Sequence, residues 1–149
     1  MSTIADADLH YEDGKKNELL DKAQTILLID DNIDIIENLA EFLEMEGYKI
    51  LVANNGGLGV ELARKFIPDL IICDVLMPEM DGYEVLRLLL DTAQTQAIPF
   101  IFSTSMSEKI DRKESLKLGA DDYIVKPFEL EALLAIIKKW VSTGSQKTR

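Results

Sequence analysis

Short apolar runs alternate with amphipathic segments along most of the chain, and this alternation predicts the secondary structure. The first run, Ile26 to Ile29, is continuous, which is typical of a strand buried on both faces of a sheet. Apolar residues then recur at helical spacing from Ile36 to Leu43, and Gly47 supplies a C-terminal stop. Further strands are predicted at 50–53, 70–73, 100–102 and 123–125. Further helices are predicted at about 57–67, 82–91, 108–118 and 128–140.

Successive strand–helix units predict an α/β fold, a five-stranded parallel sheet with helices on both faces. A flavodoxin-like, doubly wound sheet with strand order 2-1-3-4-5 is the expected topology. The domain is expected at residues 25–141, between a polar acidic leader at 1–24 and a polar tail at 142–149. Gly57 and Gly59 each cost a helix up to about 1 kcal/mol, so the second helix is expected to start late or fray.

Composition removes several classes of function. The chain is 47% apolar, but no stretch reaches the roughly 20 apolar residues of a membrane helix. Residues 1–8 lack the basic start and apolar run of a signal peptide, so we expect a cytoplasmic protein without membrane contact. A net charge of -11 argues against direct DNA binding through a basic face.

Two scarce residue types narrow the chemistry. The one cysteine, Cys73, rules out a disulfide framework, and its place in a buried strand favours a core role over a redox sensor. The one histidine, His10, lies in the polar leader, so a hydrolase with a Ser-His-Asp or Cys-His relay lacks a base. The chemistry must therefore rest on carboxylates, hydroxyls and lysines.

Carboxylates follow two of the predicted strands. Asp30 and Asp31 end the first strand and Asp74 ends the third. In the expected topology these strands are neighbours, and the active crevice lies beyond their carboxyl ends. Like charges packed this closely repel one another unless a cation joins them, and Mg²⁺ prefers such oxygen ligands. The sequence therefore predicts a magnesium site here.

The remaining strand ends supply complementary groups. Thr104 and Ser105 end the fourth strand with hydroxyl donors, and Lys126 ends the fifth with a compact positive charge. A carboxylate nucleophile, a cation, a hydroxyl and a lysine are the parts that phosphoryl transfer needs.

Four motifs in this order and spacing resemble response-regulator receivers, in particular stand-alone receivers of the chemotaxis-regulator type. The resemblance covers about Thr25 to Val141. The motifs are ILLIDDN at 26–32, DVLMPEMDG at 74–82, FIFSTS at 100–105 and GADDYIVKPF at 119–128.

The resemblance implies a role for each residue of the site. Asp74 would be the phosphoacceptor, and Asp31, Asp74 and the backbone carbonyl of Leu76 would ligate Mg²⁺. Asp30 would act mainly through an ordered water or by orienting the metal. Thr104 and Lys126 would hold the phosphoryl oxygens.

The resemblance also implies a switch and a lifetime control. The Lys126–Pro127 bond is expected to be cis. Tyr123 would turn inward once Thr104 is drawn toward the phosphate. Two apolar residues, Leu76 and Met106, would flank the approach of water, which predicts slow hydrolysis of the phosphoryl group.

The function expected on these grounds is a phosphorylation-dependent signalling switch in a two-component or phosphorelay system. A histidine kinase or phosphotransfer protein would donate to Asp74, and an output protein would bind the face formed by residues 104–140. Apart from self-phosphorylation and slow autodephosphorylation, no enzymatic activity is expected.

Two other functions remain as alternatives. An aspartyl-phosphate phosphatase of the haloacid-dehalogenase type needs a second acid two residues after the nucleophile, where this chain has Leu76. A flavin carrier needs a phosphate-binding loop after the first strand, where Asp30 and Asp31 would repel a phosphate. Both fit the residues less well than the switch does.

Overall fold

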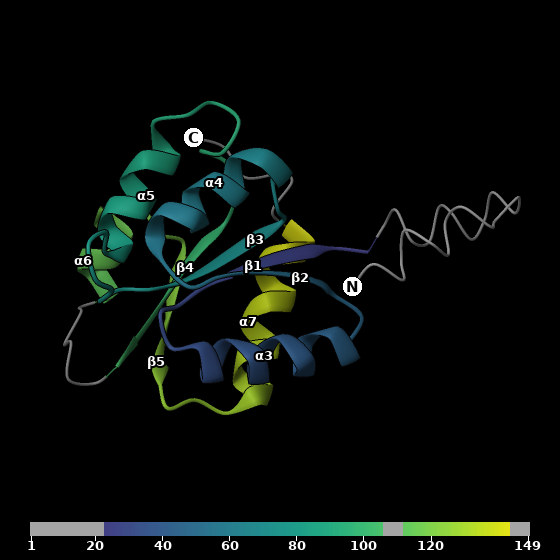
Figure 1. Ribbon diagram of the computed structural model, residues 1–149. Helices are drawn as coiled ribbons and strands as arrows, with labels where there is room; N and C mark the ends of the chain where they lie inside the picture. The colour runs from purple at the N-terminus through teal and green to yellow at the C-terminus, as the bar shows by residue number, and fades with distance from the viewer. Residues whose placement is uncertain (1–22, 106–111, 144–149) are drawn as a thin grey trace, which may run out of the picture.

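The computed structural model describes residues 23–105 and 112–143 (Figure 1). Its five parallel strands lie in the order β2-β1-β3-β4-β5, which confirms the expected topology. The strands are β1 Thr25–Ile29, β2 Lys49–Ala53, β3 Leu70–Asp74, β4 Phe100–Ser105 and β5 Asp122–Lys126. The helices within the described ranges are α3 Ile33–Met45, α4 Gly56–Phe66, α5 Gly82–Leu90, α6 Arg112–Lys117 and α7 Leu130–Thr143.

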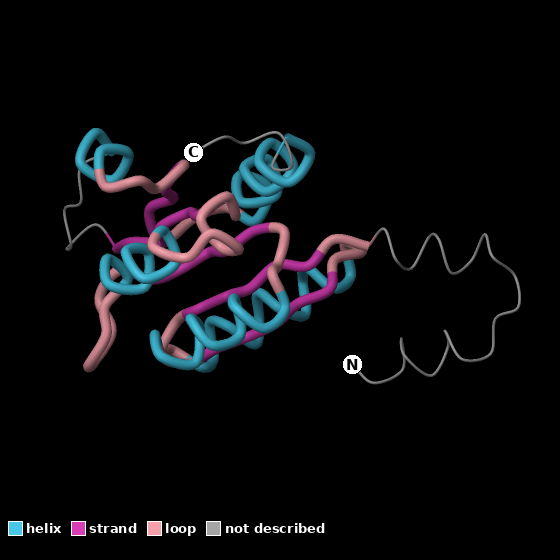
Figure 2. The backbone as a smooth tube through the Cα atoms, turned by 90° about the horizontal axis from the view of Figure 1, so that it is seen from above, coloured by secondary structure: helices cyan, strands magenta, loops and turns pink. Residues whose placement is uncertain are grey.

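Helices cover both faces of the sheet (Figures 1 and 2). On one face, Leu27 and Ile29 of β1 pack in a cluster with apolar residues of α4 and α5. On the other face, Ile26 and Leu28 pack with residues of α3 and α7. Successive side chains of a strand point to opposite faces, so a strand covered twice requires an unbroken apolar run. The continuous run in β1 has this cause.

The predicted elements agree with the structure apart from their ends. The largest difference among the strands is in β4, which runs three residues beyond the predicted 100–102, to Ser105. Gly47 has a φ of +101°, a left-handed conformation that suits the predicted helix stop. Of the helix predicted at 108–118, the structure shows α6, while residues 106–111 lie outside the described part of the chain.

The expectation that α4 starts late or frays is wrong. The helix begins at Gly56, and Asn55 caps it by accepting a hydrogen bond from the Leu58 amide at 2.8 Å. A Cβ added at Gly59 would lie 2.5 Å from Cδ1 of Ile29, and one at Gly56 would lie 2.8 Å from the Met80 carbonyl oxygen. Gly59 therefore lets α4 approach β1 closely and Gly56 lets it approach the loop after β3, so packing outweighs their low helix propensity.

No helix in the described ranges has the length and apolarity needed to cross a bilayer. Most of the leader expected at 1–24 and most of the tail at 142–149 lie outside the described residues.

Candidate functional site

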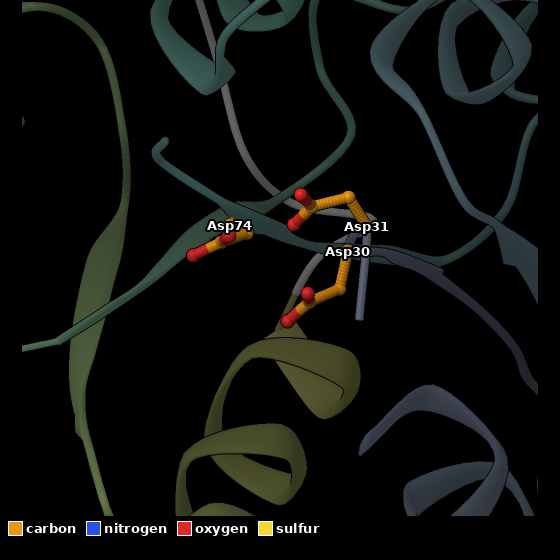
Figure 3. A group of neighbouring side chains, drawn as sticks. All are labelled: Asp30, Asp31 and Asp74. Atoms are coloured by element: carbon orange, nitrogen blue, oxygen red, sulfur yellow. The ribbon is translucent and has the colours of Figure 1, made fainter. Parts of the chain in front are cut away.

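Three carboxylates meet beyond the carboxyl ends of β1 and β3 (Figure 3). These strands pair directly, with Ile29 opposite Cys73, so the residues that follow are also neighbours. Asp30, Asp31 and Asp74 each offer a carboxylate oxygen within 4.8 Å of the others. Asp30 and Asp74 are 7% and 6% exposed, whereas Asp31 is exposed to solvent. The structure thus brings together the three acids that the sequence singles out.

Lys126 reaches into this acidic cluster from the end of β5. Its Nζ donates hydrogen bonds to Oδ2 of Asp30 at 2.8 Å and to Oδ1 of Asp74 at 3.3 Å. Burial alone lowers the pKa of the Lys126 ammonium, but the hydrogen bond to Asp30 and the two carboxylate charges outweigh it and raise the pKa. The lysine therefore stays charged and offsets part of the repulsion among the acids.

The donor set suits Mg²⁺. Oxygen ligands around this ion, at bonds of about 2.1 Å, lie roughly 3 to 4 Å apart. Carboxylate oxygens already within 4.8 Å need only a small adjustment to share one ion. Because Asp31 faces solvent, the ion could also keep several of its waters.

The turn after β1 holds the first two acids in place. Oδ1 of Asp30 accepts a hydrogen bond from the Asn32 amide at 2.9 Å. Asn32 in turn caps α3, because its Oδ1 accepts from the Ile35 amide at 3.2 Å. Asp31 thus lies between a hydrogen-bonded aspartate and a helix cap, which fix the backbone that carries its carboxylate.

The loop after β3 is closed by α5. The Gly82 amide donates to the Val75 carbonyl at 2.7 Å, and a Cβ added at Gly82 would clash with the Asp74 carbonyl oxygen. Asp81 and Glu84 form a capping box at the start of the helix. The glycine of the MPEMDG motif is therefore required because α5 rests directly on the backbone of Asp74.

The hydroxyl and switch residues lie on the two strands beyond. Thr104 is buried, and its Oγ1 donates to the Ser105 carbonyl at 3.3 Å. The pairing of β4 with β5 places Ser105 opposite Lys126. Tyr123 is half-buried and packs against the apolar cluster formed with residues of α4 and α5. The Lys126–Pro127 bond is cis, the geometry that the resemblance implies.

The remaining sequence-based candidates have different surroundings. Leu76 lies in the loop after β3 with 60% of its surface exposed, and Met106 lies outside the described residues. Cys73 is fully buried, and burial, with the nearby charge of Asp74, raises the pKa of its thiol well above the usual value. A protonated, inaccessible thiol fits a core residue rather than a redox sensor.

Sequence reasoning missed an apolar groove beside the acidic cluster, with a volume of about 500 Å³. It runs between α3, the end of β4 and the start of α7. Its walls are Ile35, Asn38, Leu39, Ser105, Lys126, Pro127, Phe128 and Leu130. In the sequence, only the apolar Pro127 and Phe128 of the GADDYIVKPF motif indicate this groove. They form one of its walls because α3 packs opposite them.

Comparison with known proteins places this geometry in context. The model of the family described as "Response regulator receiver domain" matches residues 26–138. Protein PilH of Pseudomonas aeruginosa is 39% identical over 112 residues, which cover 75% of this chain and 93% of PilH.

The transcriptional regulatory protein CpxR of Escherichia coli is 42% identical over 113 residues, but the matched part spans only 47% of CpxR. Among solved structures, the receiver domain of a sensor histidine kinase from Pseudomonas aeruginosa has a TM-score of 0.70 and 30% identity. The match covers 80% of this chain and 98% of that one, which holds a magnesium ion coordinated in its active site cleft.

Proposed function

The chain belongs to the response regulator receiver family, and from this premise we propose that Asp74 is the residue that accepts the phosphoryl group. The chain is a phosphorylation-dependent signalling switch. The observation that supports Asp74 as its acceptor is the cluster in which Asp74 shares a lysine with Asp30, beside Asp31.

The proposed reaction is transfer from a phosphohistidine of a histidine kinase or phosphotransfer protein. A carboxylate oxygen of Asp74 attacks phosphorus, the phosphorus–nitrogen bond breaks, and the imidazole leaves with the bonding electrons. Lys126, already 3.3 Å from Oδ1 of Asp74, stabilises the charge on the transferred oxygens. The Thr104 hydroxyl donates a hydrogen bond to another of the transferred phosphoryl oxygens.

Asp31, Asp74 and the Leu76 carbonyl would hold Mg²⁺, with Asp30 acting through a water or by orienting the ion. Bound there, the ion neutralises charge that develops on the phosphoryl oxygens. The solvent-facing side chain of Asp31 leaves this side of the site open to an entering ion.

The groove beside Lys126 is the surface we propose for the donor. A phosphohistidine must bring its phosphorus to Asp74, so the donor has to dock next to the acidic cluster. The walls of the groove are mostly apolar, and Lys126 belongs both to the groove and to the cluster. A donor helix that buries apolar side chains there would hold its histidine over the site.

Phosphorylation would then shift a two-state equilibrium. It replaces the single negative charge of the Asp74 carboxylate by the roughly two charges of an acyl phosphate, a net gain of about one next to Lys126, and draws Thr104 toward the phosphate. Tyr123, on the strand paired with β4, turns inward and changes the face formed by residues 104–140, where an output protein binds. We further propose a cytoplasmic location, no direct DNA binding by this domain, and no enzymatic role beyond self-phosphorylation and its slow reversal.

The phosphatase alternative is not supported. Leu76 occupies the place of the second acid of haloacid dehalogenases and cannot transfer a proton.

Incubation with acetyl phosphate and Mg²⁺ tests the acceptor. We expect intact mass spectrometry to show one added phosphoryl group, and Asp74→Asn to abolish it because an amide is not a nucleophile. Asp91→Asn, at an exposed position on the far end of α5, is the matched control and should retain the gain. Phosphorylation of Asp74→Asn at the wild-type rate would refute the assignment.

A further inference from the structure

A second groove, of about 350 Å³, lies between α5 and the end of α6, and its lining includes none of Asp30, Asp31 and Asp74. Its apolar lining comes from Tyr83, Leu86 and Leu90 of α5 and from Leu118, which follows α6. Leu86 is buried at its base, whereas Leu118 is 45% exposed. A volume of this size accommodates one or two large apolar side chains of a partner.

The rim of this groove is acidic. Asp81, Glu84 and Asp91 line it, and among the described residues Arg87 is the one cation that joins them. Arg87 lies 3.9 Å from Asp91, but both side chains are mostly exposed, so this ion pair is weak. Asp81 and Glu84 each accept one backbone hydrogen bond in the capping box, through Oδ1 and Oε1. Their other oxygens accept none from the described residues and remain available to a cation.

We propose that this groove binds a partner protein through a segment that carries an apolar anchor flanked by lysine or arginine. The anchor fills the space over Leu86, and the flanking cations meet Asp81, Glu84 and Asp91. A second copy of this chain is a poor occupant, because its net charge of -11 would bring like charges to an acidic rim.

This surface differs from the proposed output face. Of the described residues that line it, only Leu118 falls within residues 104–140, and the main wall is α5. That wall is firmly seated, because Gly82 rests on the Asp74 backbone and the Tyr83 ring meets Phe102 edge to face at 5.3 Å. Binding therefore uses a preformed surface and does not require phosphorylation of Asp74.

A titration of ¹⁵N-labelled, unphosphorylated protein with a designed helical peptide tests the proposal. The peptide presents leucines at i and i+4 flanked by lysines, and a scrambled peptide of equal composition controls for general attraction to an acidic protein. We expect chemical shifts to change first at Tyr83, Arg87 and Leu118. Binding of the scrambled peptide with equal affinity and the same shifts would overturn the proposal.

Two neighbouring leucines provide matched variants. Leu118→Glu should weaken the peptide about tenfold, because it places a charge against the apolar anchor. Leu116 is similarly exposed, at 41%, but does not line the groove, so Leu116→Glu should change affinity less than about twofold. Equal effects of the two variants, or no effect of either, would overturn the proposal.

A charge reversal and a size measurement complete the test. Asp91→Lys should weaken binding, whereas Glu61→Lys, on the exposed face of α4, should matter less. Sedimentation of the wild type should show a monomer at the concentrations used. Self-association that Leu118→Glu abolishes would identify a second copy as the occupant and overturn the basic partner.

Discussion

Buried aspartates lie at both ends of the sheet, and they are used in opposite ways. Asp74 and Asp122 are each 6% exposed. At the start of β5, Asp122 accepts one hydrogen bond from the indole of Trp140 at 3.0 Å and one from the Tyr123 amide at 2.9 Å. Neutral donors of the protein itself thus engage both of its oxygens, and the carboxylate ties α7 to the sheet.

At the carboxyl ends of the strands, Asp74 instead lies within 4.8 Å of two other carboxylates and shares one lysine with Asp30. The described residues compensate the charge there only in part, so we expect the site to attract a cation, which would offset the charge of the proposed phosphoryl group. Burial alone therefore does not mark a functional carboxylate. Clustering with like charges around one cation is what marks a carboxylate as a functional candidate.

The largest expected difference between the two ends concerns the lysine. Lys126→Met leaves Asp30 and Asp74 without their cation, and breaking a buried pair costs about 3 kcal/mol of unfolding free energy. Trp140→Phe removes one hydrogen bond from a neutral donor to the Asp122 carboxylate and should cost about 1.5 kcal/mol. Urea denaturation in Mg²⁺-free buffer measures both. The contrast fails if the two variants lose equal stability.

Magnesium should distinguish the two ends next. Bound at 100 times its dissociation constant, it should stabilise the wild type by about 2.7 kcal/mol. The stabilisation should vanish in Asp31→Ala and persist in Trp140→Phe, because Asp31, unlike Trp140, contributes an oxygen to the cluster. Thermal unfolding across a Mg²⁺ titration measures this. A flat titration in the wild type would remove the ion from the proposed site.

The smallest expected effect concerns the phosphoryl lifetime. Leu76 and Met106 cannot orient a water by hydrogen bonding, so we expect slow autodephosphorylation. Leu76→Asn and Met106→Glu should each shorten the lifetime, roughly tenfold for 1.4 kcal/mol of transition-state stabilisation. Trp140→Phe, at the other end of the sheet, should leave it unchanged. Radiolabel decay at fixed Mg²⁺ is the measurement, and decay of the wild type within seconds would contradict the prediction.

Much of the architecture could be predicted because the constraints are local. A strand covered on both faces must be apolar throughout, so β1 and β3 stand out as continuous runs. Parallel order places Asp30, Asp31 and Asp74 at one edge, and the structure brings their oxygens together. The roles proposed for Leu76, Met106 and Tyr123 stay predictions, since they concern a phosphorylated state.

Other features could not be predicted, because they depend on contacts between distant parts of the chain. Helix propensity counts against Gly59. Glycine is nevertheless needed there, because a Cβ would lie 2.5 Å from the side chain of Ile29 in β1, which is 30 residues away in the sequence. The hydrogen bond between Asp122 and Trp140 has no local signature at either residue.

Sequence by itself determined the element order, the two-sided burial of the strands and the acids at their ends, because periodicity and strand direction are properties of adjacent residues. Only the tertiary structure decided which buried aspartate is satisfied and which is clustered, how closely α4 and α5 approach the sheet, and where grooves open between helices. These depend on the space and charge that remain after distant segments pack together.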